Sequence, residues 1–219
     1  MLRTGVAIGA VARVGGRSYA DGMAQITTRP ATMAEWDDVQ AALTGGGDGR
    51  SCQCVWPLLP SKEWSVTTVD EREQLLHDEI EAGPAPGLVA YVDGRAAGWI
   101  RIGPRTAQAR ILRSRIVKSG SDEPLDDGDV WAVTCFSVRK EHRGQGLNAS
   151  LLEAAIDYAR DSGARVVEAY PIATDTTKTS SNSLFVGALS TFLGAGFHEI
   201  ARPTATRAVV ALDLPGAAA

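Results

Sequence analysis

The sequence predicts a single α/β domain built on a mixed sheet, and two local patterns carry this prediction. An apolar, β-rich run at 131–138 is followed by a glycine turn, an amphipathic helix and a second apolar run at 164–169. Strand, helix and strand in this order require a parallel crossover. Asp93-Gly94 divides the apolar segment 88–102 into halves, which is typical of an antiparallel hairpin. The 219 residues suffice for one such domain with its own core.

Composition excludes several classes of protein. The net charge of −4 argues against a nucleic-acid-binding surface. No apolar run approaches the length of a membrane-spanning helix, so no membrane partner is expected. Three cysteines, an odd number without a disulfide framework, favour a reducing, cytoplasmic location.

The expected domain spans residues 24–214. Residues 1–23 are rich in Gly, Ala and Arg and contain no acidic residue before Asp21. They predict a disordered tail or a mis-assigned start, with Met23 as the working initiator. A signal peptide and an organelle transit peptide are the alternatives. Residues 215–219 form a short C-terminal tail.

The N-terminal part of the domain is expected to contain one strand and two helices. The strand covers 25–29 and is ended by a proline. The helices cover 33–43 and 69–82, and each is opened by a Thr-x-x-Glu capping box that begins at Thr32 or Thr68.

Residues 45–67 form a loop-rich insert between these helices. The insert carries Cys52, Cys54, Trp56 and Trp64, whose side chains must pack somewhere. They form either a lid over a binding pocket or a satellite cluster on the core. Cys-x-Cys supplies two thiolates, whereas a closed zinc site needs four ligands. Free thiols, and no metal, are therefore expected.

The remaining elements complete the sheet. The basic segment 107–119 forms either a cationic rim for an anion or a solvated face with its apolar residues inward. The strand at 164–169 is followed by a polar loop, a helix at 184–193 and two closing strands, at 197–201 and 206–214.

The turn after strand 131–138 predicts an anion site. The first N–H groups of a helix have no partner inside it, and the helix dipole adds partial positive charge there. Gly144 and Gly146 allow positive φ and a close approach of the backbone to a ligand. Phosphate or pyrophosphate is the ligand that such a site favours. The turn lacks the Gly-Lys-Ser/Thr of a Walker A loop and, with Ala149 after its glycines, the Rossmann Gly-x-Gly-x-x-Gly.

This turn resembles the acetyl-CoA motif of the GNAT acetyltransferase superfamily, which reads Gln/Arg-x-x-Gly-x-Gly/Ala after a strand ending in Val. Val138, Arg143 and Gly146 match that pattern, and Asn148 stands where Gly or Ala is usual. The Gly-Phe pair at 196–197, between a helix and a strand, is a second similarity to these enzymes.

The resemblance implies a fold, a co-substrate and a reaction. The fold is GNAT-like α/β (α+β), with a mixed, mostly antiparallel sheet and helices on both faces. The strand end would pair with the pantetheine of acetyl-CoA, and the glycine turn would hold its pyrophosphate. The expected acetyl-CoA-binding residues are Phe136, Ser137, Val138, Arg143, Gly144, Gln145, Gly146, Leu147, Asn148 and Ala149. The acetyl group would pass directly to a primary amine of a small molecule or protein. A homodimer fits the resemblance, because dimers are common among similar enzymes.

Two side chains are candidates for proton transfer. Glu168 is a carboxylate within an apolar strand, where burial raises a carboxyl pKa toward that of a general base. A salt bridge to a nearby arginine, or exposure at the strand end, is the alternative. Phe192 stands where the superfamily has its proton-donating Tyr, so Tyr170, Ser190, Thr191 or water must protonate the leaving thiolate.

Other functions remain open. The missing Tyr motivates an alternative function, a catalytically weak or inactive acyl-CoA-binding regulatory module. An unrelated phosphate-binding enzyme using the same loop is a further candidate. Cys135 on the central strand is disfavoured as a nucleophile because no activating His is indicated.

Overall fold

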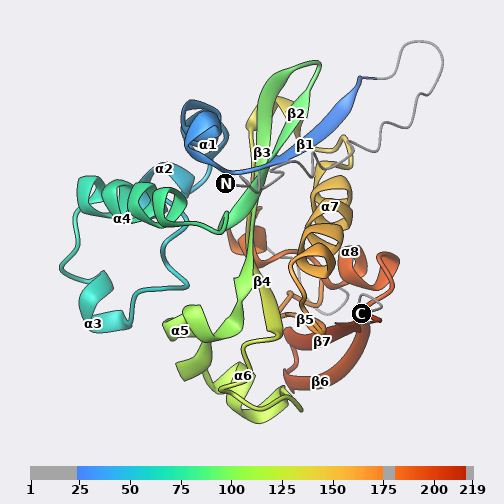
Figure 1. Ribbon diagram of the computed structural model, residues 1–219. Helices are drawn as coiled ribbons and strands as arrows, with labels where there is room; N and C mark the ends of the chain where they lie inside the picture. The colour runs from blue at the N-terminus through green and yellow to red at the C-terminus, as the bar shows by residue number, and fades with distance from the viewer. Residues whose placement is uncertain (1–23, 175–180, 216–219) are drawn as a thin grey trace, which may run out of the picture.

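The computed structural model describes residues 24–174 and 181–215; residues 1–23 and most of the C-terminal tail lie outside the described residues. The chain forms a seven-stranded sheet in the order β1-β2-β3-β4-β5-β7-β6 (Figure 1). The strands are β1 (Ile26–Pro30), β2 (Gly87–Val92), β3 (Arg95–Pro104), β4 (Val130–Val138), β5 (Val166–Ala169), β6 (His198–Thr204) and β7 (Arg207–Asp213). Among the strands of the described residues, only β4 and β5 pair in parallel, which confirms the mixed, mostly antiparallel sheet.

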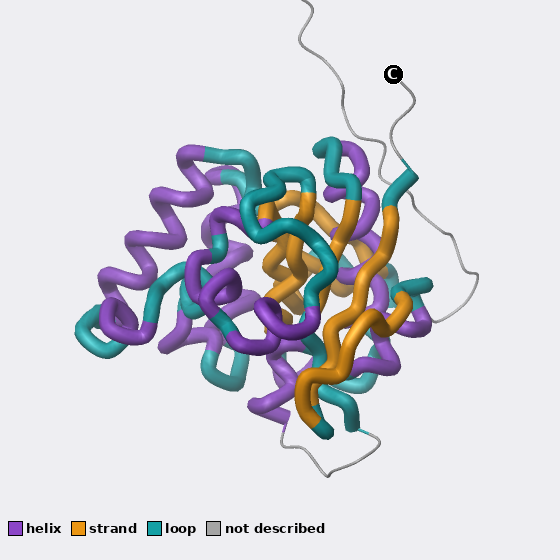
Figure 2. The backbone as a smooth tube through the Cα atoms, turned by 90° about the horizontal axis from the view of Figure 1, so that it is seen from below, coloured by secondary structure: helices purple, strands orange, loops and turns teal. Residues whose placement is uncertain are grey.

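Helices cover both faces of the sheet (Figures 1 and 2). On one face, α7 and α8 pack over an apolar core that includes Leu151, Leu152 and Phe192. On the other face, α1 and α4 pack over a second core that includes Leu43, Leu76 and Trp99. No helix in the described part of the chain is long and apolar enough to cross a membrane. The longer helices are α1 (Trp36–Thr44), α4 (Val69–Ala82) and α7 (Leu147–Asp161), and the short ones are α2 (Gly49–Cys52), α3 (Ser61–Trp64), α5 (Ala109–Arg113), α6 (Arg115–Gly120) and α8 (Leu189–Gly194).

Both capping boxes form as the sequence predicts. The Thr32 side chain opens the 3-10 turn η1 (Met33–Glu35) that leads into α1. At α4, the Thr68 hydroxyl accepts from the backbone N–H of Glu71 at 3.2 Å, and the Glu71 carboxylate accepts from the Thr68 backbone at 2.7 Å. These reciprocal bonds satisfy amides that a helix leaves unpaired, so both helices begin where expected.

One expected helix is divided into two pieces, and segment 107–119 forms two short helices. Segment 184–193 divides at Gly187 (φ +83°) into the 3-10 turn η4 (Ser181–Val186) and α8. Segment 107–119 divides at Ser114, whose extended backbone ends α5 and whose hydroxyl caps α6. The insert at 45–67 also contains two single-turn helices, α2 and α3.

The parallel pair β4–β5 separates part-way along β4. Val130 to Val133 pair with Val166 to Ala169, and β4 then continues to Val138 without β5 beside it. On its other edge β4 stays paired with β3 as far as Val138. The sheet therefore opens on one side of the end of β4, next to the glycine turn.

Candidate active site

A cavity of about 620 Å³ lies at the point where β4 leaves β5. Its walls come from the end of β4, the glycine turn, the first residues of α7, the insert and η4. All the residues expected to bind acetyl-CoA line it except Gln145 and Ala149. The structure therefore brings the strand end and the turn into one site.

The glycine turn presents unpaired amides at this cavity. The backbone N–H groups of residues 144–148 have no hydrogen-bond partner among the described residues. Gly144 (φ +77°) and Gly146 (φ +79°) adopt left-handed backbone, and Gly146 is the N-cap of α7. A helix N-terminus with free amides and glycine turns before it is suited to an anion such as a pyrophosphate.

Polar side chains near the turn also fit an elongated polar ligand. The Oδ1 atom of Asn148 is buried, lies on a cavity-lining residue and has no partner among the described residues. Arg143 is exposed at the mouth, and its Nε donates to the carbonyl of Val138 at 3.3 Å. An unsatisfied buried acceptor is costly unless a ligand or water pairs with it.

The insert forms the opposite wall. Cys52, Cys54, Trp56 and Trp64 all line the cavity. The Trp56 ring meets Phe185 of η4 edge-to-face, with centroids 5.7 Å apart. The insert is therefore placed as a lid would be, although a lid role in catalysis stays a prediction.

Arginines from other elements hold the two tryptophans. The guanidinium of Arg72 lies over the Trp64 ring, 3.6 Å from its centroid, and that of Arg110 lies 4.6 Å from the centroid of Trp56. Cation–π contacts of this kind stabilise aromatic side chains in one orientation. The aromatic part of the cavity wall is thus fixed by α4 and α5.

Comparison with known proteins agrees with this geometry. The family model described as "Acetyltransferase (GNAT) family" matches residues 53–185, more than half of the chain. The chain belongs to the GNAT acetyltransferase family. No curated protein sequence matches this GNAT acetyltransferase, so the solved structures supply the other comparison.

Solved structures of GNAT proteins share the fold of this acetyltransferase. A GNAT-family protein from Desulfovibrio desulfuricans has 16% identity and a TM-score of 0.51, over 86% of this chain and 98% of that one. An N-acetyltransferase from Staphylococcus aureus has 15% identity and a TM-score of 0.50, with the same coverage of 86% and 98%. A GCN5-related N-acetyltransferase from Kribbella flavida has 17% identity and a TM-score of 0.50, again over 86% and 98%. At these identities the likeness concerns the fold alone.

Glu168 and Tyr170, the residues expected to move protons, do not line the cavity of this acetyltransferase. Glu168 is fully buried, and its Oε2 accepts from Arg105 Nη1 and from the Tyr170 hydroxyl, both at 2.7 Å. Its Oε1 accepts from the Ser121 hydroxyl at 2.6 Å. The alternative of a salt bridge to a nearby arginine is therefore the arrangement found, and catalytic roles for both residues stay predictions. Burial and the adjacent Glu168 charge raise the pKa of Tyr170 well above its usual value.

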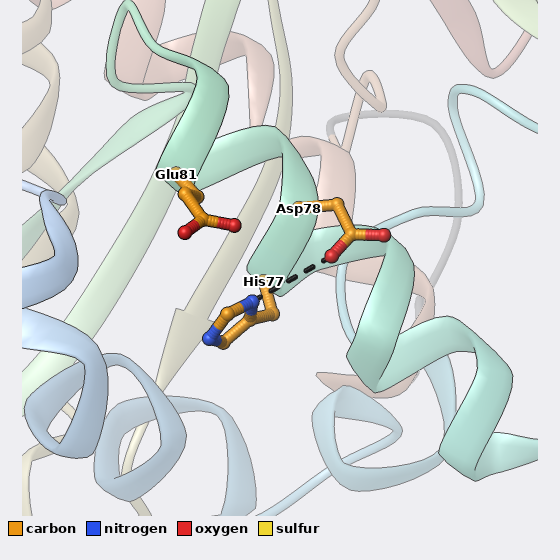
Figure 3. Close-up of side chains that lie close together, drawn as sticks. All are labelled: His77, Asp78 and Glu81. Atoms are coloured by element: carbon orange, nitrogen blue, oxygen red, sulfur yellow. Dashed lines mark ion pairs between the residues drawn. The ribbon is translucent and has the colours of Figure 1, made fainter.

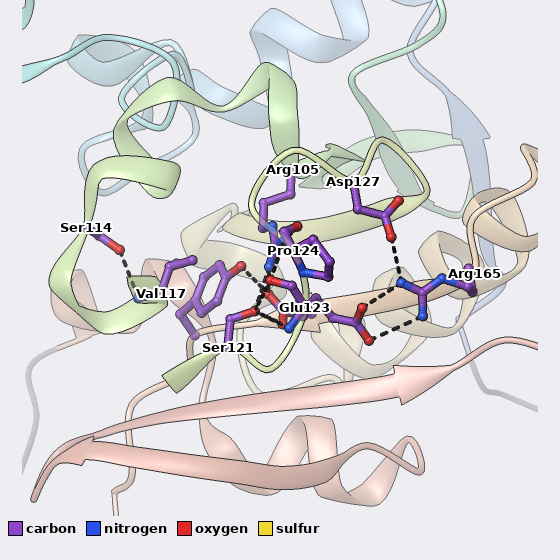
Figure 4. A network of polar contacts seen from close by, with 10 residues as sticks. Arg105, Ser114, Val117, Ser121, Glu123, Pro124, Asp127 and Arg165 are labelled. Atoms are coloured by element: carbon purple, nitrogen blue, oxygen red, sulfur yellow. Dashed lines mark hydrogen bonds and ion pairs between the residues drawn. The ribbon is translucent and has the colours of Figure 1, made fainter. Parts of the chain in front are cut away.

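Arg105, the partner of Glu168, also belongs to a larger network around the loop before β4, which Figure 4 shows. Arg105 also donates to the Ser121 hydroxyl at 2.7 Å and to the carbonyl of Pro124. Figure 4 shows Arg165 reaching the carboxylate of Glu123, and the ion pair measures 2.5 Å. These contacts give the network a role in holding the loop against β5.

Residues that could hold a metal lie elsewhere. Among the described residues, only His77, Asp78 and Glu81 place three ligand atoms close together, within 4.8 Å of one another (Figure 3). They lie on α4 and do not line the cavity, and both carboxylates are exposed. Cys52 and Cys54 belong to no such group among the described residues.

Sequence reasoning missed the side chains behind the insert. Trp99 and Arg101 on β3 are fully buried and contact Cys54. No local pattern signals this contact, because Cys54 and Trp99 are 45 positions apart in the chain. The hairpin signal predicted β3 itself, but not which insert residue would cover it.

Proposed function

We propose that this protein binds acetyl-CoA in the cavity and transfers the acetyl group directly to a primary amine of a small molecule or protein. The observation that carries the proposal is the set of free amides at 144–148, at the N-terminus of α7 and beside the separated end of β4. These groups suit the pyrophosphate of coenzyme A. Membership of the GNAT family supports the same assignment.

The remaining predicted residues divide into two roles. Residues 136–138 lie beyond the last β4–β5 pair, so their β5-facing backbone is free to pair with pantetheine amides. Residues 143–149 surround the proposed pyrophosphate position. A backbone N–H of β4 beside the thioester would polarise its carbonyl, as an oxyanion site does.

The amine would enter from the side of the insert. The aromatic side chains of Trp56, Trp64 and Phe185 line that side of the cavity, and they suit an acceptor with an apolar body. The attacking amine must be neutral, so a base has to take its proton. A cytoplasmic location and a homodimer stay predictions.

A second candidate is an acyl-CoA-binding regulatory module with little or no turnover. The observation that favours it is Phe192, which is fully buried and has no proton to give. Such a module would bind acetyl-CoA with the same residues but would release no acetylated amine.

The proposed pyrophosphate site is tested by a matched pair of variants, Gly144→Asp and Gly144→Asn. Both side chains tolerate left-handed backbone, and a Cβ at Gly144 meets nothing within 4 Å. Only Asp adds a negative charge. Calorimetric titration with CoA should show affinity falling about tenfold or more for Gly144→Asp, with a much smaller change for Gly144→Asn. Equal affinities of the two variants would contradict the proposed pyrophosphate position.

Turnover is tested separately by incubating the protein with acetyl-CoA and a metabolite pool, and screening for acetylated amines by mass spectrometry. An acetylated product would support the enzyme. Binding of CoA with no product from any amine would favour the module. Thermal-shift titrations with CoA, ATP and NAD complete the test, because stabilisation by ATP or NAD but not CoA would refute acetyl-CoA as the co-substrate.

A further inference from the structure

Cys54 occupies an unusual position on the cavity wall. It follows α2 and adopts a left-handed backbone (φ +53°), as does the preceding Gln53 (φ +47°). Left-handed backbone costs roughly 1–2 kcal/mol for each non-glycine residue. The buried side chain of Gln53 holds this turn, accepting from Gln40 at 3.0 Å and donating to the carbonyl of Arg50 at 3.1 Å. The strained turn points to a fixed position for Cys54.

Hydrogen-bond donors surround the sulfur of Cys54. The indole N–H of Trp99 donates to it at 3.0 Å, and the Cys135 thiol is a close neighbour that lowers its pKa. The guanidinium of Arg101, 2% exposed, lies beside it. The Nη1 and Nη2 atoms of Arg101 donate to the two carboxylate oxygens of Glu79, at 2.9 and 2.7 Å. Its Nε–H has no partner among the described residues. Donors and a buried cation favour the thiolate.

These contacts separate the pKa values of the three cysteines. Burial alone raises the pKa of Cys54, but the neighbouring Cys135 thiol, the charge of Arg101 and the Trp99 donor outweigh it and lower the pKa to about 7. Burial, followed by repulsion from Cys54, raises the pKa of Cys52 to about 11. The neighbouring Cys54 sulfur, followed by burial, raises the pKa of Cys135 well above its usual value. Near neutral pH, Cys54 is thus the cysteine that carries substantial thiolate.

The thiolate and the proposed acetyl-CoA site share one cavity. Cys54 and Cys135 line the same space as Phe136, Ser137 and Val138, beside which the pantetheine would lie. The thioester carbon of acetyl-CoA would therefore be brought to the wall that holds Cys54. Arg101 is paired with Cys135 across β3 and β4, which ties the cation to the strand end.

We propose that Cys54 is a nucleophile that accepts the acetyl group of bound acetyl-CoA when no amine occupies the cavity. The thiolate sulfur attacks the thioester carbonyl carbon, forming a new carbon–sulfur bond. The bond between that carbon and the CoA sulfur breaks, and CoA leaves as a thiolate that takes a proton from water. One thioester replaces another, so no oxidant, reductant or further reactant is needed.

This step goes beyond direct transfer to the amine and rests on the proposed binding of acetyl-CoA. The acetyl group on Cys54 remains activated as a thioester, so it can return to CoA or pass to an amine that enters later. Trp99 and Arg101 are positioning residues here, because they act through the Cys54 sulfur.

The test incubates the full chain with excess acetyl-CoA and no amine, quenches in acid, and measures intact mass followed by peptide mapping. We expect one acetyl group on the peptide that contains Cys54. Cys52→Ser, the matched neighbouring thiol, should be labelled like the wild type, and Cys54→Ser should not. Because wild-type mapping locates the label, the test does not depend on the folding of Cys54→Ser.

Calorimetry with CoA on the same samples separates the two proposals. Binding of CoA without acetyl on Cys54, or with acetyl only on Cys52 or Cys135, overturns the Cys54 step and leaves the proposed function standing. Absence of CoA binding overturns the proposed function, and the Cys54 step with it. A label on Cys54 that neutral hydroxylamine removes, as expected for a thioester, supports the Cys54 step.

Discussion

Replacing Glu168 by Gln distinguishes a carboxylate that stabilises the fold from one that takes part in catalysis. The Glu168–Arg105 pair is fully buried, with both side chains 0% exposed and an N–O distance of 2.7 Å. Both carboxylate oxygens accept hydrogen bonds, from Arg105, Tyr170 and Ser121. Gln keeps the shape but offers one oxygen, so its amide nitrogen would face a donor while Arg105 stays charged.

The expected loss of stability is large. Removing one partner of a buried ion pair costs about 3–5 kcal/mol, because the other charge stays buried without compensation. For a protein of this size each kcal/mol lowers the melting temperature by roughly 2–4 °C, so the Glu168→Gln variant should melt roughly 6–20 °C below the wild type. Circular dichroism on heating and urea unfolding both measure this effect.

Two controls sharpen the result. Glu199→Gln breaks the solvent-accessible pair that Glu199 forms with Arg202 at 2.7 Å, and an exposed pair contributes about 0–1 kcal/mol. Arg105→Met combined with Glu168→Gln should lose less than the sum of the single losses, because no buried charge remains.

The opposite outcome would refute the structural reasoning. If the Glu168→Gln variant had the melting temperature of the wild type but lost acetyl-CoA turnover, Glu168 would be the general base that the sequence predicts. Unchanged turnover per folded molecule would remove it from the mechanism.

Three smaller perturbations test other parts of the fold and site. Gly146→Ala should lower the free energy of unfolding in urea by about 1–2 kcal/mol, because Gly146 has a positive φ. Gly194→Ala should lower it little, because a Cβ there also meets nothing within 4 Å and φ is not positive. Equal losses of stability in the two variants would contradict this reasoning. Trp99→Phe removes a hydrogen-bond donor to the Cys54 thiolate, so the pKa of Cys54 should rise. The pH at which the rate of alkylation by iodoacetamide is half-maximal should then lie above the value near 7 expected for the wild type, and an unchanged pH would count against that donor. Thr68→Ala should destabilise the protein by about 1 kcal/mol through loss of the α4 capping box, and an unchanged urea midpoint would exclude that contribution.

Much of the fold could be predicted because its signals are local. The Asp93-Gly94 hairpin needs only residues that are neighbours in the chain, and both central residues have the positive φ that this turn requires. The crossover from β4 to β5 follows from strand, helix and strand in sequence order. The residues of the glycine turn were likewise identified from adjacent positions, and their amides are free as a helix N-terminus requires.

The break in segment 184–193 could not be predicted, because its cause is tertiary. A Cβ at Gly187 would lie 2.6 Å from the Phe192 ring and 3.1 Å from that of Phe136. The chain needs glycine and positive φ there so that these rings can pack. Helical periodicity carries no information about that contact, so the pattern predicts one continuous helix.

The partners of buried polar groups could not be predicted from the sequence either. Glu168 was recognised as an unusual carboxylate, but Arg105 lies 63 positions earlier in the chain. Burial suggests that Glu168 could act as a base, but its ion pair with Arg105 offsets the cost of burying the carboxylate. A buried carboxylate in a sequence therefore predicts a partner at least as strongly as it predicts catalysis.

The structure also limits which side chains can exchange protons with a ligand in the cavity. Phe192 packs edge-to-face against Phe136 and Phe197, with centroids 5.9 and 5.3 Å away, so its position belongs to the core. The titratable side chains that do line the cavity, within the described residues, come from the insert, β4 and the turn: Asp48, Cys52, Cys54, Cys135, His142 and Arg143. Of these, Cys54 has its pKa lowered to about 7, close to neutral pH. If a protein group rather than water exchanges protons with the amine or with CoA in this cavity, Cys54 and His142 are better placed than Glu168 or Tyr170.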